Sequence, residues 1–176
     1  MKIKKQIWLI KKMSKKILIV YYSLTGNTKY IAESIKEAVD ADIQPIKPIK
    51  EIDPKGAMKY IWGGMQALMK NNPNLLPIEK KPTAYDLIFL GTPVWAWTIS
   101  PPIRAFIEQY DLSGKKIAIW CCSGGNPGKT LEKLKSAIKN AQILGEIDFV
   151  EPLTNKKEIA QQKVKSWAKE ITNKLN

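Results

Sequence analysis

The chain has 176 residues, of which 44% are hydrophobic and 26% are charged, as in one soluble globular domain. This composition excludes wholesale disorder, and no run approaches the roughly 18 apolar residues of a membrane-spanning helix. Histidine is absent, and the two cysteines, Cys121 and Cys122, are adjacent. A triad with a histidine base and a four-thiolate zinc site are therefore excluded, and the sequence predicts neither a metal site nor a catalytic residue.

The net charge is +13, but Arg104 is the only arginine. Proteins that bind nucleic acids usually rely on arginine for bidentate contacts, so we expect no nucleic-acid partner. Residues 1–14 are rich in lysine and are predicted to be a basic extension, with the domain spanning residues 15–176. The apolar run 7–10 is too short for a secretory signal, which favours a cytoplasmic protein. An alternative for this extension is a short amphipathic segment that touches anionic membrane.

In chain order, short apolar runs alternate with helical patterns, as in βαβ units with a parallel sheet. The runs predict strands at 17–22, 42–49, 86–90, 116–120 and within 142–150. Helices are expected after the first strand, over 54–70, over 100–110, from 126, and at the C-terminus. The strand at 42–49 contains two prolines, which cannot donate to a ladder, so it belongs at an edge of the sheet. Asn155 and Glu158 are spaced as a capping box for the last helix. The sequence thus predicts a three-layer α/β sandwich.

Ligands of such open sheets bind beyond the carboxyl ends of the strands. The first loop at this edge is rich in hydroxyl groups and has one glycine: Ser23, Leu24, Thr25, Gly26, Asn27 and Thr28. It precedes a helix N-terminus, whose unpaired N–H groups favour an anion. We interpret it as a phosphate-binding loop that needs neither lysine nor metal. The alternative is an ordinary helix cap, which would use only one of these hydroxyls.

The second loop at this edge carries two tryptophans in the run Gly91, Thr92, Pro93, Val94, Trp95, Ala96 and Trp97. A loop at a strand end has little interior to fill, so the tryptophans indicate stacking with a flat aromatic ligand. The alternatives are a cover for the core or a dimer patch.

The third loop runs from Cys121 to Asn126 and contains Ser123, Gly124 and Gly125. The two glycines allow a ligand to approach the backbone closely. The segment 123–130 also falls one residue short of a nucleoside-triphosphate P-loop. Ser123 replaces its first glycine and Pro127 removes a donor, which disfavours that interpretation. The cysteines are interpreted as small apolar residues at a strand end, with thiol redox chemistry as the alternative.

Together the three loops resemble those of a flavodoxin, over residues 15–176. The segment 17–28 matches the S/T-x-T-G-x-T phosphate motif of that family at every constrained position. The resemblance implies a five-stranded parallel sheet in the order 2-1-3-4-5, with FMN as the cofactor. It places the phosphate on loop 23–28 and the flavin ring against Trp95 and possibly Trp97. Thr92, Pro93, Ser123, Gly124 and Gly125 would border the ring.

The resemblance implies an FMN-binding electron-transfer protein whose partner is a redox protein. The alternative is an NAD(P)H-dependent oxidoreductase that reduces a quinone or a similar small-molecule acceptor. The chain departs from acidic electron-carrying flavodoxins because it is basic and because loops 91–100 and 121–128 contain no acidic residue. Attraction should then stabilise an anionic reduced flavin, which predicts a less strongly reducing protein.

Overall fold

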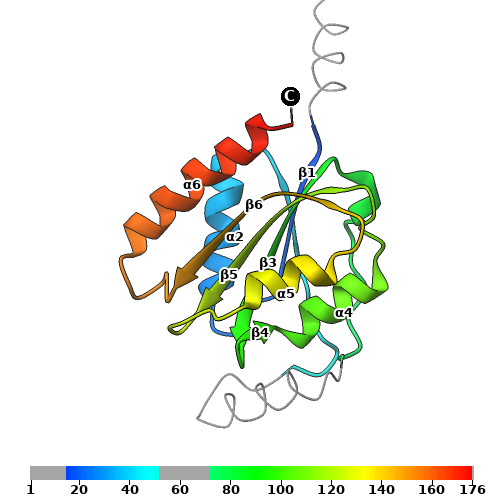
Figure 1. The fold of residues 1–176 in the computed structure, drawn as a ribbon, viewed down its shortest axis with the longest axis horizontal. Helices are drawn as coiled ribbons and strands as arrows, with labels where there is room; N and C mark the ends of the chain where they lie inside the picture. The colour runs from blue at the N-terminus through cyan, green and yellow to red at the C-terminus, as the bar shows by residue number, and fades with distance from the viewer. Residues whose placement is uncertain (1–14, 52–71, 176) are drawn as a thin grey trace, which may run out of the picture.

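A computed structural model describes residues 15–51 and 72–175, and these residues form a sheet with helices on both faces (Figure 1). The sheet has five parallel strands: β1 (Ile17–Tyr21), β2 (Asp42–Pro45), β3 (Leu87–Trp95), β5 (Lys116–Ser123) and β6 (Gln142–Val150). Their spatial order is β2-β1-β3-β5-β6. Numbered in chain order as parallel strands, this is the predicted order 2-1-3-4-5, so the predicted fold is confirmed. A short strand that was not predicted, β4 (Thr98–Ile99), pairs antiparallel with the end of β3.

Four helices cover the sheet within the described part of the chain (Figure 1). Helices α2 (Asn27–Ala38) and α6 (Lys157–Asn173) pack on one face, and α4 (Pro101–Gln109) and α5 (Thr130–Ala137) pack on the other. A single 3-10 turn, η1 (Pro82–Ala84), precedes β3. The helix expected over 54–70 and the basic extension at 1–14 lie outside the described residues.

The central strand β1 is buried on both faces, as its uninterrupted apolar sequence predicts for a parallel strand. Ile19 packs toward α2 and α6, whereas the neighbouring residue Val20 packs toward α4 and α5. Strand β2 pairs only with β1 in the described sheet, so the prediction of a proline-bearing edge strand is confirmed. It ends at Pro45, four residues before the predicted end.

Two predicted helix starts are wrong. Helix α5 begins at Thr130 rather than at Asn126, because the Asn126 side chain accepts the Gly128 N–H (2.8 Å) and holds a turn there. The predicted capping box of α6 does not form. The Asn155 N–H donates to the Glu151 carbonyl (2.8 Å), and Lys156, in the left-handed region at φ 52°, becomes the N-cap without a side-chain hydrogen bond.

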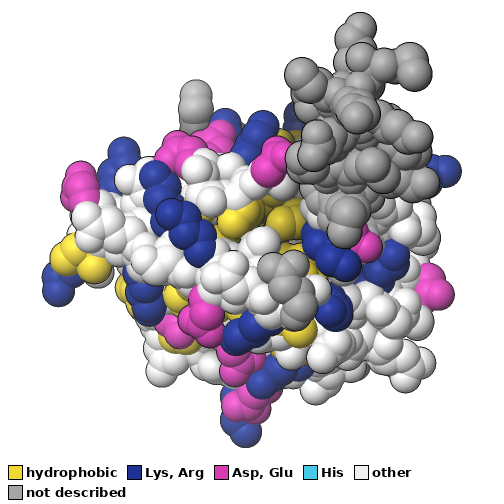
Figure 2. All heavy atoms as spheres, turned by 90° about the horizontal axis from the view of Figure 1, so that it is seen from above, with side chains coloured by type: hydrophobic (Ala, Val, Ile, Leu, Met, Phe, Trp, Pro, Cys, Tyr) yellow, Lys and Arg dark blue, Asp and Glu magenta, His cyan; other side chains and the backbone are white. Residues whose placement is uncertain are grey.

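Within residues 15–51 and 72–175 no helix combines the length and the apolar character that crossing a membrane requires. The face shown in Figure 2 carries lysines interspersed with acidic side chains. In the described part of the chain, Lys80 pairs with Asp42 (3.2 Å) and Lys165 pairs with Glu37 (2.7 Å).

Candidate functional site

The loop between β1 and α2 turns at a glycine that caps the helix. Gly26 lies in the left-handed region (φ 95°) and forms the N-cap of α2, and its N–H donates to the Ser23 hydroxyl oxygen (3.2 Å). A Cβ on Gly26 would also stand 3.1 Å from the Leu153 side chain. The positive φ favours glycine here, and a side chain would also require Leu153 to shift by a few tenths of an ångström. Ser23, Leu24 and Asn27 are half-buried, and Thr25 is exposed.

Thr28, in the first turn of α2, has a buried polar side chain. The residue is 1% exposed, yet its hydroxyl makes no hydrogen bond of ordinary geometry to the described part of the chain. The hydroxyl lies close enough to the Cys122 thiol to lower the pKa of that thiol, although burial raises this pKa more strongly. A buried hydroxyl without a partner is costly, so a donor in this position fits a bound anion. The residues of the loop thus fit a phosphate group.

A fourth loop, 151–156 between β6 and α6, contacts loop 23–28, and the sequence analysis did not predict it. The Leu153 N–H donates to the Asn27 side-chain oxygen (3.0 Å), so that oxygen helps to join the two loops. Glu151 has a positive φ (42°), and its N–H donates to the Ser123 carbonyl (2.9 Å). The topology could have predicted this loop. Strand β6 is parallel to β5, so the loop after it lies at the same edge of the sheet as the other three loops.

The Glu151 carboxylate lies 3.8 Å from the point where a Cβ on Gly124 would stand. The third loop therefore faces an acidic side chain, although its own sequence contains none. The expectation of a weakly reducing flavin considered only loops 91–100 and 121–128. A carboxylate at this position opposes that effect, because it disfavours negative charge nearby.

The second predicted loop is largely a β-hairpin. Strand β3 continues through Trp95, and a two-residue turn leads to β4. Ala96 and Trp97 both have positive φ (48° and 56°), as a type I′ turn requires. The buried Thr92 hydroxyl lies 3.0 Å from the Ser100 hydroxyl and accepts the Ser100 N–H (3.0 Å). Thr92 thus links the end of β3 to Ser100 beyond the hairpin. Pro93 and Val94 are half-buried residues of β3.

The structure separates the two tryptophans that the sequence placed together. Trp95 packs edge-on against Tyr22, with ring centroids 5.7 Å apart and an interplanar angle of 83°. Trp97 is 64% exposed and lies over Gly128, where a Cβ would stand 2.9 Å from the indole. The Lys133 ammonium donates to the Trp97 carbonyl (3.0 Å). The two rings therefore face different neighbours, with Trp95 toward β1 and Trp97 toward the third loop.

The third loop is ordered by its own hydrogen bonds. The Ser123 hydroxyl, at the end of β5, donates to the Gly125 carbonyl (2.6 Å). A Cβ on Gly125 would meet no atom within 4 Å, so the loop leaves open space beside it. The buried Thr130 hydroxyl donates to the Pro127 carbonyl (2.6 Å). In a nucleoside-triphosphate P-loop this hydroxyl would bind magnesium, so its use in a local cap further disfavours that alternative.

The two cysteines are free, buried thiols within β5. Burial raises the pKa of Cys121 to about 12, with Asp148 adding to the effect, and burial also raises the pKa of Cys122. Since the thiolate is the reactive form, both side chains are inert at neutral pH. The interpretation as small apolar residues is supported over thiol chemistry.

We expect neither cysteine of the folded protein to react with Ellman's reagent at pH 8, whereas both react in urea. Because both thiol pKa values are raised in the folded protein, the free energy of unfolding keeps its full value below the ordinary thiol pKa. It decreases as pH rises from there toward the folded pKa values, since the unfolded chain loses these protons first.

Replacing both cysteines by alanine should leave flavin binding intact. Rapid labelling of the native protein would contradict this assignment.

Comparisons with known proteins agree with this architecture. The flavodoxin family model matches residues 16–171. A comparison with curated protein sequences gives no match. Among solved structures, a flavoprotein from Lactobacillus acidophilus in complex with FMN has 23% identity and a TM-score of 0.67, covering 82% of this chain and 98% of that one.

Two further structures share the fold. The flavodoxin, WrbA-like protein from Agrobacterium tumefaciens has 17% identity and a TM-score of 0.64, covering 92% of this chain and 98% of that one. Flavodoxin 2 from Bacillus cereus has 22% identity and a TM-score of 0.58, covering 90% and 99%. The family match extends over most of the chain and includes all three predicted loops. The chain belongs to the flavodoxin family.

Proposed function

We propose that this flavodoxin binds FMN and transfers electrons between redox partner proteins. The observation that carries the proposal is the buried Thr28 hydroxyl, which has no ordinary hydrogen-bond partner in the described chain. It lies at the start of α2 behind the left-handed Gly26, where N–H groups and the helix dipole favour an anion. Family membership and the FMN complex of the Lactobacillus acidophilus flavoprotein support the choice of FMN.

In this proposal the phosphate of FMN binds loop 23–28, and the flavin ring lies at the hairpin and the third loop. The residues that would hold the cofactor are Ser23, Leu24, Thr25, Gly26, Asn27, Thr28, Thr92, Pro93, Val94, Trp95, Trp97, Ser123, Gly124 and Gly125. Bound FMN supplies the redox chemistry, while the protein contributes position and field. Thr92 acts indirectly, because its hydroxyl closes the hairpin. Gly125 leaves space for the ring to approach the backbone.

The test is reconstitution of the purified chain with FMN. We expect a yellow protein whose flavin fluorescence is quenched, since an aromatic side chain near the ring accepts excitation energy and electrons. Riboflavin, which lacks the phosphate, is the matched control and should bind at least about tenfold more weakly, because it loses charge-assisted hydrogen bonds. Equal affinities for FMN and riboflavin would contradict the phosphate site, and a colourless protein would contradict the proposal altogether.

A second candidate is an NAD(P)H-dependent oxidoreductase that reduces a small acceptor such as a quinone. The observation that favours it is a pocket of about 350 Å³ beside Trp95. The likeness to the WrbA-like protein is compatible with either role, because at 17% identity it concerns the fold alone. Steady-state oxidation of NADH or NADPH by the FMN-loaded protein separates the two, since a carrier shows almost none without a reductase.

A further inference from the structure

Lysines gather at the amino edge of the sheet, which lies opposite the loops proposed to hold FMN. Two of them precede β1, two precede the turn η1 that leads into β3, and two lie where β5 begins. Figure 2 views the molecule from the end at which β1 begins and shows lysines at several places across it. This basic edge comprises Lys15, Lys16, Lys80, Lys81, Lys115 and Lys116.

Contacts between these segments place the lysines at one end of the molecule. The Lys115 ammonium donates to the carbonyls of Thr83 (2.9 Å) and Tyr85 (3.0 Å), which joins the start of β5 to the segment before β3. Lys15 and Lys16 line a hollow of about 400 Å³ together with Tyr85. The basic edge is therefore formed by neighbouring segments, although they are far apart in the sequence.

Acidic residues compensate only part of the charge at this end. Asp42 pairs with Lys80 (3.2 Å), and the Asp86 carboxylate accepts the Lys16 backbone N–H (2.8 Å). Two further lysines, Lys36 and Lys139, lie at the ends of α2 and α5 and add to the positive charge. The acidic residues of the same segments are Asp40, Asp42, Glu79, Asp86 and Asp111. Positive charge therefore remains in excess there.

Three lysines of the basic edge are available to a partner. Lys15, Lys16 and Lys81 are exposed, and none of them forms an ion pair within residues 15–51 and 72–175. The three predicted loops at the opposite edge contain no charged residue. The lysines therefore suit an anionic surface that meets the end of the molecule away from those loops.

The sequence that precedes β1 adds both charge and apolar residues at the same end. Residues 1–14 contain five lysines, no acidic residue and the apolar run Ile7, Trp8, Leu9 and Ile10. Lysines around an apolar run with a tryptophan are typical of segments that bind anionic membrane surfaces. Contacts to a nucleic-acid backbone would not need the apolar run, and Arg104 is the only arginine of the chain.

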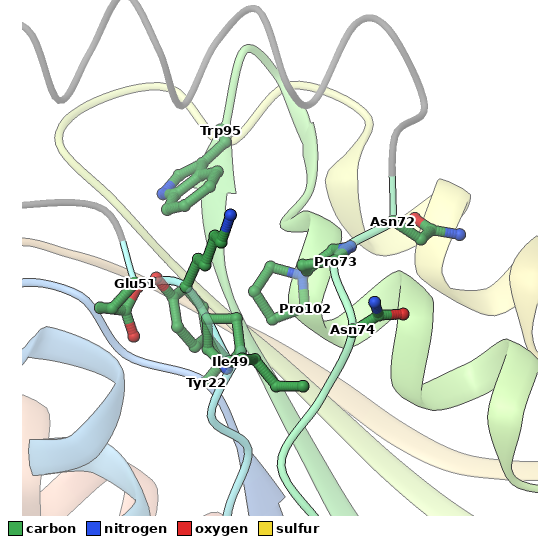
Figure 3. A pocket seen from close by; sticks show the side chains of 10 residues that line it. Tyr22, Ile49, Glu51, Asn72, Pro73, Asn74, Trp95 and Pro102 are labelled. Atoms are coloured by element: carbon green, nitrogen blue, oxygen red, sulfur yellow. Dashed lines mark hydrogen bonds between the residues drawn. The ribbon is translucent and has the colours of Figure 1, made fainter.

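We propose that the basic edge, together with residues 1–14, binds the surface of an anionic membrane. Each lysine near such a surface adds attraction, and the apolar run adds burial among the lipid head groups. The inference does not rest on the proposed function, because it concerns the opposite edge from the predicted loops and from the pocket beside Trp95 (Figure 3). A chain bound in this way would turn the loops proposed to hold FMN away from the membrane.

The experiment is co-sedimentation of the purified full chain with lipid vesicles. We expect binding to vesicles of phosphatidylcholine and phosphatidylglycerol to be at least about tenfold tighter than to phosphatidylcholine alone, because only the former carry net negative charge. Binding should be lost in about 1 M sodium chloride, where the Debye length falls to about 3 Å. Equal binding to both kinds of vesicle, or no binding to either, would overturn the proposal.

A triple variant tests the basic edge itself: Lys15→Gln, Lys16→Gln and Lys81→Gln. These exposed side chains form no ion pair in the described chain, so the substitutions should leave the fold unchanged, which far-UV circular dichroism verifies. Binding to the anionic vesicles should weaken at least about tenfold, since each lysine near the surface contributes to the attraction. An unchanged affinity would show that the basic edge does not face the membrane.

The control is a triple variant at the carboxyl edge that removes the same charge: Lys47→Gln, Lys129→Gln and Lys156→Gln. These lysines are also exposed, and they follow β2, β5 and β6. The affinity of the control for the anionic vesicles should stay within about twofold of the unmodified chain, because charges beyond a Debye length from the lipid are screened. Equal losses in the two triple variants would mean that net charge alone drives binding, which would overturn the assignment of the surface.

Trp8→Ser tests whether the surface recognises lipid rather than any polyanion. It should weaken binding to the anionic vesicles about tenfold, because it removes apolar burial and no charge. The competing polyanion is a DNA duplex, whose binding Trp8→Ser should not affect. If the duplex bound as tightly as the anionic vesicles and Trp8→Ser left both affinities unchanged, the membrane assignment would be wrong.

Discussion

Replacing Gly91 by alanine is expected to destabilise the protein by about 3 kcal/mol, the upper end of the usual range for overpacking a core. Gly91 lies in the middle of β3, next to Trp120 of the neighbouring strand β5. An alanine Cβ would stand 2.1 Å from two ring carbons of Trp120. Trp120 is fully buried, so the ring cannot swing into solvent to relieve this overlap. The measurement is the free energy of unfolding of the FMN-free chain in urea.

Two further variants make this prediction specific. Gly125→Ala is the control, since a Cβ there meets no atom within 4 Å, and it should change stability by less than about 0.5 kcal/mol. The second is Trp120→Phe in the Gly91→Ala background. The smaller phenylalanine ring lacks the outer indole carbon Cζ2, which lies 2.1 Å from the new Cβ, so it relieves part of the overlap and the two substitutions should be non-additive. Equal unfolding free energies for Gly91→Ala and Gly125→Ala would contradict the packing argument.

Gly91 and Trp120 illustrate which parts of the fold the sequence could predict and which it could not. The apolar runs around Gly91 and Trp120 predict two buried parallel strands, because a strand covered by helices on both faces must be apolar throughout. The prolines of β2 predict its edge position by a comparably direct argument. Nothing in the sequence indicates that Gly91 leaves room for Trp120, since that contact depends on the register between β3 and β5.

The candidate site could also be predicted only in part, because some of its features have a local sequence signal and others depend on contacts between distant residues. Loop 23–28 carries its signal in six consecutive residues, so it could be recognised before the fold was known. The contact between Asn27 and Leu153 joins residues 126 positions apart and has no local signal. The prediction of a capping box at Asn155 was wrong because it used a local sequence pattern alone. In the structure the Asn155 N–H donates to the Glu151 carbonyl, and Glu151 lies next to the third loop, so a tertiary contact determines this turn.

The second large effect is expected at Thr28, where valine should improve the stability of the FMN-free protein and impair cofactor binding. Valine keeps the shape of threonine and removes a buried hydroxyl that lacks an ordinary hydrogen bond. We therefore expect the free energy of unfolding without FMN to rise by about 1 kcal/mol. If the hydroxyl donates to the phosphate, affinity for FMN should fall about ten- to a hundredfold, since hydrogen bonds to charged groups are the stronger ones. Urea unfolding and FMN titration measure the two effects separately.

Thr130→Val is the matched control, because Thr130 is also a buried threonine in the first turn of a helix. Its hydroxyl donates to the Pro127 carbonyl (2.6 Å), so the substitution breaks a hydrogen bond and should destabilise the FMN-free protein by about 1 kcal/mol. The two variants thus differ in the sign of their effect on stability, although the chemical change is the same. If Thr28→Val lost as much stability as Thr130→Val and kept full affinity for FMN, the Thr28 hydroxyl would be a structural group and the phosphate assignment would be wrong. The expected result, a gain in stability coupled to a loss of binding, is the behaviour of a residue kept for its ligand at the expense of the fold.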